Sequence, residues 1–350
     1  MGIDLEQRDQ VDETLGYRGG LVHAFRLDGK GGGAKLGWPE IDADPLGSKA
    51  AGDIWIHMNR AAPRVQGWLT ESARVPEQAA EMLLVEDPRP KFVHFASDET
   101  HPEGFVLILR GVNLNPNADP ENMVAVRLWV DEHRVISLRR RKVMAVGTIR
   151  DAISKGQGQG PVSSVDLVNQ LIASLLDRVD PVVDELEADL DHAEDRLEQA
   201  ELSKVRNDIG EVRRSAIRLR RYLAPQRELL THAMTDMPAW VSKKEKLRLR
   251  AKAERVARVV EDIEELITRA GFAHEELHAR LDERMNRIST GLTIVATIFL
   301  PMGLVASMWG MNTRGLPFAD ADLGFWSVTG IIVVVGLGLA AFGWKMSRIN

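Results

Sequence analysis

Two long apolar stretches without a break lie at the C-terminal end of the chain. Residues 291–309 and 325–344 contain no charged side chain and are 19 and 20 residues long. A helix of about 20 apolar residues crosses a hydrocarbon core of about 30 Å. Neither stretch has the polar face that a helix of a globular protein usually shows, and tryptophans occur near their ends. We therefore predict two transmembrane helices rather than two buried core helices.

Charges that flank these spans predict the orientation of the chain. Basic residues lie before the first span and after the second, whereas the loop 310–324 carries one arginine and two aspartates. Because basic loops stay in the cytoplasm, we expect both termini to be cytoplasmic and the loop 310–324 to be periplasmic, with 345–350 as a cytoplasmic tail. The N-terminal residues show no apolar segment of the kind that a signal peptide has.

Before the spans, the first 160 residues alternate between β-rich and helical patterns. Short β-rich runs predict six strands, at residues 20–27, 54–58, 92–95, 104–109, 123–129 and 134–138. Helical patterns lie at 64–72 and 77–84, the second directly after Pro76. The sequence GQGQG at 156–160, followed by Pro161, predicts a linker. We expect residues 1–160 to form a cytoplasmic α+β domain.

A change of charge sign marks the next region, residues 161–241. Residues 177–201 have a net charge of −9 and residues 204–227 a net charge of +6, with Ser203 placed to cap a helix between them. Opposite charges joined by a short turn predict an antiparallel helical hairpin. The acidic block is either a solvated face or a field that concentrates cations near a pore.

One long helix is predicted from residue 243 into the membrane. It follows Pro238 and Ser242 and meets no further proline until Pro301. If it is continuous to Trp309, its 67 residues are about 100 Å long. Residues 242–290 then form a stalk helix that continues into the first span, 291–309.

The composition narrows the possible classes of function. The 350 residues include no cysteine, which excludes a disulfide framework, a cysteine zinc site and a thiol nucleophile. The net charge of −6 argues against nucleic acid as a partner of the whole chain.

The tripeptide Gly310-Met311-Asn312, at the end of the first of two terminal spans, resembles that of the CorA superfamily of divalent-cation transporters. The resemblance extends over the whole chain and implies a homopentameric funnel in the cell inner membrane, with the first span lining a central pore. Four segments look more like the zinc-transporting ZntB branch: DIWIHMN at 53–59, RGVNLNPNAD at 110–119, RRRK at 139–142 and RRYLAPQR at 220–227. Met311 is instead typical of magnesium transporters.

From this resemblance we expect zinc uptake, coupled to protons as the ZntB branch implies, with a CorA-type Mg²⁺/Co²⁺ channel as the alternative. The transported ion is the only metal expected, and no cofactor or enzymatic activity follows. Membrane lipids and other copies of the chain are the expected partners.

Polar residues on the first span and the turns before it step by three or four, as one face of a helix requires. They are Asn286, Ser289, Thr293, Thr297 and, a few turns on, Ser307. Such residues either line a pore or pack between membrane helices. We expect them to line the pore, with Leu292 and Leu300 as apolar constrictions, whereas Met302 is expected to pack. The carbonyl of Gly310 and the amide of Asn312 would form an outer filter that holds a hydrated ion.

The stalk also carries the pattern H-E-x-x-H, as His274-Glu275-Glu276-Leu277-His278. Two histidines four residues apart share one helix face and can bind zinc, and Asp282 continues that face. Three interpretations follow: a membrane-anchored zinc peptidase, a metal or proton site at the cytoplasmic mouth, or a solvated or packing face. The peptidase is the least favoured, because no third histidine follows at the spacing that such enzymes use.

Overall fold

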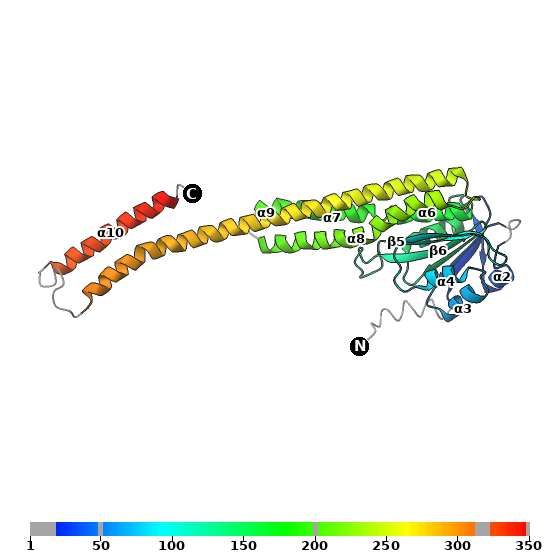
Figure 1. Ribbon diagram of the computed structural model, residues 1–350, viewed down its shortest axis with the longest axis horizontal. Helices are drawn as coiled ribbons and strands as arrows, with labels where there is room; N and C mark the ends of the chain where they lie inside the picture. Colours follow the sequence, from blue (N-terminus) through cyan, green and yellow to red (C-terminus); the bar gives the residue numbers. More distant parts are fainter. Residues whose placement is uncertain (1–18, 48–51, 199–201, 312–322, 348–350) are drawn as a thin grey trace. The chain divides into compact units, whose positions relative to one another are not determined.

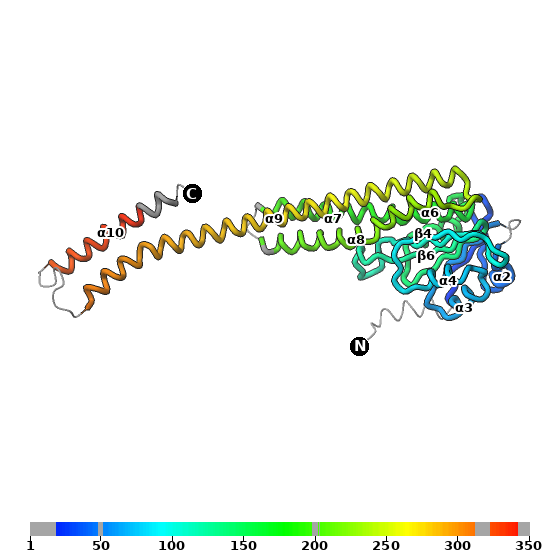
Figure 2. The backbone as a smooth tube through the Cα atoms, viewed as in Figure 1, coloured from blue at the N-terminus to red at the C-terminus, as the bar shows by residue number. Residues whose placement is uncertain are grey.

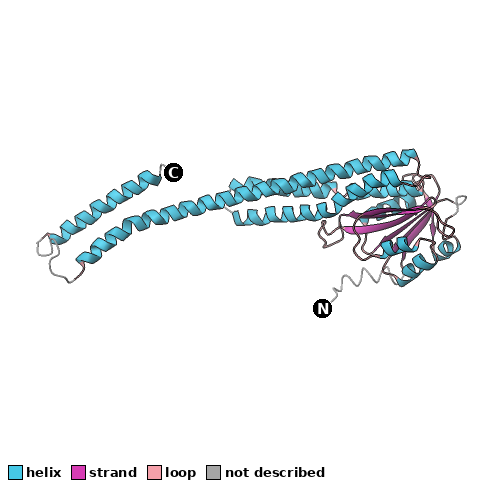
Figure 3. Ribbon diagram, in the orientation of Figure 1, coloured by secondary structure: helices cyan, strands magenta, loops and turns pink. Residues whose placement is uncertain are grey.

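The computed structural model describes residues 19–47, 52–198, 202–311 and 323–347 (Figure 1). The chain forms two compact units, Met1–Ala273 and His274–Asn350. All the strands of the described residues belong to the first unit, and the second is helical (Figure 3).

A seven-stranded sheet is the centre of the first unit. Its strands follow the order β2-β1-β3-β7-β6-β5-β4, and only the β3–β7 pair is parallel. The strands are β1 (Leu21–Leu27), β2 (Gly33–Leu36), β3 (Ile54–Asn59), β4 (Lys91–Phe95), β5 (Gly104–Gly111), β6 (Val124–Asp131) and β7 (Arg134–Arg139). All six predicted strands are therefore confirmed. β2 was not expected, because four residues beside a glycine-rich turn give too short a pattern.

Helices cover both faces of this sheet. On one face, α2 (Trp38–Ala43), α3 (Pro63–Glu71) and α4 (Glu77–Leu84) share a buried apolar core with β1, β3 and β5–β7. α6 (Ser164–Leu176) packs on β5 and β6, and the long helix α8 packs on β4 and β5. The two predicted helices in this region, at 64–72 and 77–84, correspond to α3 and α4.

The glycine-rich segment 156–160 is held in place by contacts and is not a free linker. It follows the unpredicted helix α5 (Met144–Lys155), which Gly156 ends in the left-handed conformation, with φ +63°. The Gly160 amide donates a hydrogen bond to the Gly31 carbonyl over 3.0 Å, and a Cβ on Gly31 would lie 2.6 Å from the Gly158 carbonyl carbon. The expectation of a linker is corrected, and the compact unit continues beyond it to Ala273.

The expected hairpin is present, but its charges pair in another way. α7 (Asp180–Asp195), the short 3-10 helix η2 (Arg196–Glu198) and α8 (Leu202–Asp236) form it, with α7 packed on α8. Arginines of the next helix, α9 (Lys243–Trp309), pair with these acids: Arg255 contacts Asp180 of α7 and Asp177 just before it, and Arg269 contacts Asp191 and Glu194. Figure 2 shows α7, α8 and the first half of α9 side by side.

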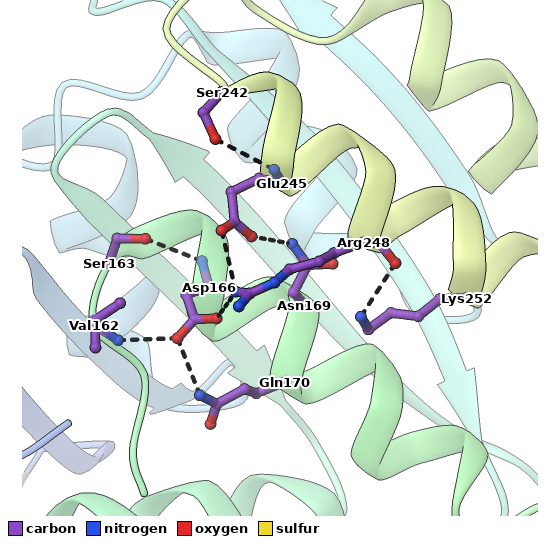
Figure 4. A network of polar contacts seen from close by, with 9 residues as sticks. All are labelled: Val162, Ser163, Asp166, Asn169, Gln170, Ser242, Glu245, Arg248 and Lys252. Carbon is purple, nitrogen blue, oxygen red and sulfur yellow. Dashed lines mark hydrogen bonds and ion pairs between the residues drawn. The ribbon is translucent and has the colours of Figure 1, made fainter. Parts of the chain in front are cut away.

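α9 is continuous over the predicted 67 residues. Its N-terminus is capped by Ser242, whose Oγ accepts from the Glu245 amide over 3.2 Å. A polar network then holds its first turns to α6 (Figure 4). Arg248 donates to Asp166 over 2.9 Å and to Glu245 over 3.1 Å, and Glu245 accepts from Asn169 over 2.7 Å.

The second unit contains the end of α9 and the helix α10 (Gly324–Ser347). Both helices have a segment long and apolar enough to cross a membrane, which agrees with the two predicted spans. None of the residues in the apolar window of α9 is buried within one chain. Lipid or other protein surfaces must therefore cover it.

Candidate functional site

The predicted pore residues lie on an open face of α9. Leu292 and Leu300 are 70% and 73% exposed, and Asn286, Ser289 and Thr293 are exposed as well. One subunit therefore leaves this face uncovered along its whole length.

A second stripe of α9 is partly buried. It consists of Ile294, Ile298, Met302, Val305 and Trp309. On a helix of 3.6 residues per turn, its mean direction differs from that of the five predicted pore residues by about 170°. The two stripes thus lie on opposite sides of the helix.

α10 packs against this second stripe. Val328 is buried, as is Gly336, and a Cβ added to Gly336 would lie 2.8 Å from the Met302 sulfur. The packing role expected for Met302 is confirmed. The opposite, polar face remains available to other copies of the chain or to water.

Threonine hydroxyls on the polar face have a fixed orientation. Thr293 Oγ1 donates to the Ser289 carbonyl over 2.9 Å, and Thr297 Oγ1 donates to the Thr293 carbonyl over 2.8 Å. Each hydroxyl hydrogen is used within the helix, so the oxygen lone pairs remain as acceptors for water. A row of acceptors suits the hydration shell of a cation.

The outer end of α9 coincides with the predicted filter. The Gly310 amide donates to the Ala306 and Ser307 carbonyls, and the Met311 amide to the Met308 carbonyl over 3.4 Å, so the helix stops here. Met311 is 54% exposed. Asn312 lies outside the described residues, so its position in a filter stays a prediction. The two aspartates of the loop 310–324, Asp320 and Asp322, lie outside them as well.

At the other end of the polar face, the two histidines of the H-E-x-x-H pattern meet. The Nε2 atoms of His274 and His278 are 3.2 Å apart, and their ring centroids are separated by 4.7 Å. Asp282 is exposed one turn further along. Within the described part of one subunit, no group of three or more His, Asp or Glu side chains has metal-binding spacing, so Asp282 does not complete a site there.

Two of the segments that carry the family resemblance join the sheet to α8. Arg110 at the end of β5 lies over the Tyr222 ring at 4.5 Å and donates to carbonyls at 88 and 123. Its own amide donates to Gln226 Oε1 over 2.8 Å. Arg110, Tyr222 and Gln226 thus position helices, and they are far in sequence from the polar face of α9.

A buried histidine pair in the sheet escaped the sequence analysis. His23 and His57 are 5% and 1% exposed, with ring centroids 4.9 Å apart. Ser137 Oγ lies 2.8 Å from His57 Nδ1 and accepts a hydrogen bond from Trp55 Nε1. Burial, followed by the charge of Arg150, lowers the pKa of His23 to about 3, and burial also holds the pKa of His57 well below its usual range. Both rings are therefore neutral at ordinary pH.

The acidic block on α7 is partly neutralised. Arg255 and Arg269 of α9 pair with three carboxylates of α7 and with that of Asp177, which precedes it. Glu187 lies among further acids: burial, and then the charges of Asp262 and Asp184, raise its pKa. The four paired acids therefore join helices, a role that neither interpretation of this block included.

Comparison with known proteins identifies the family. Residues 51–344 match the family model described as "CorA-like Mg2+ transporter protein". The chain is 34% identical over 338 residues to the "Divalent cation transporter CmaX" of Pseudomonas aeruginosa, covering 94% of this chain and 96% of that one. It is 30% identical over 329 residues to the "Zinc transport protein ZntB" of Pectobacterium carotovorum, covering 94% and 95%.

Solved structures agree with these sequence relationships. The full-length CmaX protein superposes with a TM-score of 0.78 at 33% identity, covering 95% of this chain and 98% of that one. The CorA magnesium transporter of Methanocaldococcus jannaschii has the same fold, with a TM-score of 0.76 at 17% identity, covering 92% and 97%.

The chain combines an α+β unit, a long helix whose end is the first apolar segment, and a second apolar helix, α10. Relatives with this fold are membrane transport proteins and not enzymes. The chain belongs to the CorA-like family of divalent-cation transporters. Because members of this family are transporters, the interpretation of His274 and His278 as part of a peptidase is excluded.

Proposed function

We propose that the protein takes up zinc through a pore on the symmetry axis of a homopentamer. The observation that carries this proposal is the division of α9 into two opposite faces, one packed on α10 and one polar and open. Two helices cannot enclose a wet path, so polar faces from several copies must surround it, and ring symmetry closes such an assembly.

In this pentamer each α9 contributes Asn286, Ser289, Leu292, Thr293 and Leu300 to the pore. The leucines form apolar rings that can close the path by excluding water. At the outer mouth, Gly310, Met311 and Asn312 form a filter of carbonyl and amide oxygens that holds an ion with its water shell. Both termini are cytoplasmic and the loop 310–324 is outside, as the flanking basic residues indicate.

Zinc is the proposed ion because a relative of 30% identity over 94% of the chain is named a zinc transport protein. The alternative is a Mg²⁺/Co²⁺ channel, which Met311 and the description of the family model favour. Proton coupling is proposed only by analogy with the ZntB branch, since neither span contains an ionisable side chain.

Ion flux into liposomes tests these proposals. We expect Zn²⁺ entry into vesicles that contain the protein, and a loss of most of it in Asn312→Ala with an unchanged oligomer mass. Asn207→Ala, an exposed asparagine of α8, is the matched control. Entry of Mg²⁺ but not Zn²⁺ selects the alternative, and entry of neither ion refutes transport. An internal pH dye that stays constant during zinc entry refutes proton coupling.

A further inference from the structure

The histidine pair on α9 has the geometry of two ligands of one metal ion. His274 Nε2 and His278 Nε2 are 3.2 Å apart. With metal–nitrogen bonds of about 2.0–2.1 Å, nitrogens at this separation form an angle of about 100° at the metal. That angle lies between the 90° of an octahedral ion and the roughly 109° of a tetrahedral one. The separation of the two nitrogens therefore already suits one ion.

The nitrogen donors select a class of ion. Imidazole is a common ligand of Zn²⁺ and of the chemically similar Co²⁺ and Ni²⁺. Mg²⁺ prefers oxygen ligands and loses its water reluctantly. A pair of imidazoles therefore distinguishes transition-metal dications from Mg²⁺. The oxygen groups on the polar face of α9 do not make this distinction.

The pair also lies on the face proposed to line the pore. His274, His278, Asp282 and Asn286 follow at steps of four residues on the unbroken helix α9. The mean direction of the first three differs from that of the five proposed pore residues by about 30°. An ion that passes Asn286 along this face next meets Asp282 and then the two imidazoles.

Two protein ligands make an open and exchangeable site. Because the described residues of one subunit bring no third His, Asp or Glu to the pair, water must fill the other coordination positions. Asp282, one turn away and exposed, can accept hydrogen bonds from such waters. A site on a conduction path must bind an ion weakly enough to release it, and this arrangement meets that condition.

We propose that His274 and His278 together bind a partly hydrated transition-metal dication, Zn²⁺ in the first place, where the polar face of α9 enters the cytoplasm. The location of this metal site on the ion path rests on the proposed function. Binding of the metal ion does not depend on that function, because both ligands belong to one helix of one subunit.

Calorimetric titration of the full chain in detergent with Zn²⁺, in the presence of excess Mg²⁺, tests the binding. We expect His274→Ala and His278→Ala each to remove a zinc site or to weaken it at least about tenfold. His192→Ala, an exposed histidine on the helix α7, is the matched control and should keep the site. Unchanged elution from a sizing column and unchanged helical content show that each variant is folded. Equal isotherms for the four proteins overturn the proposal.

Flux measurements separate this proposal from the proposed function. In liposomes, the two histidine variants should carry less Zn²⁺ than the His192→Ala control while Mg²⁺ entry is unaffected. If the unaltered protein carries neither ion but its zinc site disappears in His274→Ala, transport fails and the binding proposal stands. If zinc enters normally and the histidine variants bind and carry it like the control, the binding proposal fails alone.

Discussion

Gly336 of α10 lies against Met302 of α9 so closely that a Cβ at this glycine would come within 2.8 Å of the methionine sulfur. The contact holds the two apolar helices of one subunit together at a position where neither has a polar side chain. Small residues permit such close approach between membrane helices.

We therefore expect Gly336→Val to separate α10 from α9 and to lower both ion flux and thermal stability in detergent. Alanine should be milder, because the end of a methionine side chain can move. The cost of overpacking by the valine side chain is about 1–3 kcal/mol. Gly338→Val is the control, because no atom lies within 4 Å of a Cβ at that position. Equal losses in both variants would show that bulk on α10, and not this contact, is responsible.

Asn286 and Arg284 should behave in opposite ways. Asn286 is on the polar face of α9, and Arg284 is displaced from it by about 200° on the helix. Asn286→Leu should reduce flux several-fold by making the cytoplasmic exit apolar, without changing the oligomer mass. Arg284→Gln should affect assembly or insertion more than conduction. Normal flux in the first variant, with altered ion selectivity in the second, would mean that the pore face has been assigned about half a turn from its true position.

The arginines that join α9 to α7 should contribute modestly to stability. Arg255 and Arg269 each contact two carboxylates, but their side chains are 30% and 37% exposed. Such pairs usually contribute up to about 1 kcal/mol each. We expect the double variant Arg255→Gln, Arg269→Gln to unfold at lower denaturant concentration, with a difference that shrinks at high salt.

The control for this experiment is Arg250→Gln. Arg250 pairs with Glu254 of its own helix, over 3.1 Å, and so joins no two elements. A loss of stability in the control as large as in the double variant would assign the effect to total charge rather than to the contact between α7 and α9.

The buried histidine pair should make the first unit sensitive to acid. His23 has a folded-state pKa of about 3, below the ordinary value of 6.5. Between these pH values the unfolded chain binds a proton that the folded chain does not, so stability falls as pH falls below 6.5. The loss is at most about 1.4 kcal/mol per pH unit for this group.

Unfolding midpoints at pH 7.5 and 5.0 measure this effect. His23→Leu should flatten the dependence, while His232→Ala, an exposed histidine of α8, should leave it unchanged. A dependence of the same steepness in His23→Leu and in the unaltered chain would show that other groups dominate.

The stalk could be predicted from the sequence because each signal on it is local. Ser242 caps the helix, no proline follows before Pro301, and the uncharged stretch is long enough to span a membrane. The division of α9 into two faces could also be predicted, from residue spacing. The residues of α10 that cover one of these faces could not.

The parts that could not be predicted depend on contacts between distant residues. His23 and His57 become neighbours only through the β1–β3 register, which has an irregularity at His23. The GQGQG segment has the composition of a linker, and only its contact with Gly31 shows otherwise. The acids of α7 could pair with the basic residues of α8 or with those of α9, and composition alone does not show that Arg255 and Arg269 of α9 are the partners.

Pro301 lies inside α9 and has no amide hydrogen. The carbonyl of Thr297, four residues earlier, therefore lacks its helical donor. An unpaired backbone acceptor facing hydrocarbon costs several kcal/mol, and in membrane helices water, a polar side chain, a neighbouring helix or a local change of helix geometry satisfies such an oxygen. Thr297 and Thr293, one turn before it, both belong to the polar residues of this face. The backbone thus offers a polar acceptor at the level of these threonines, halfway through a segment with no charge.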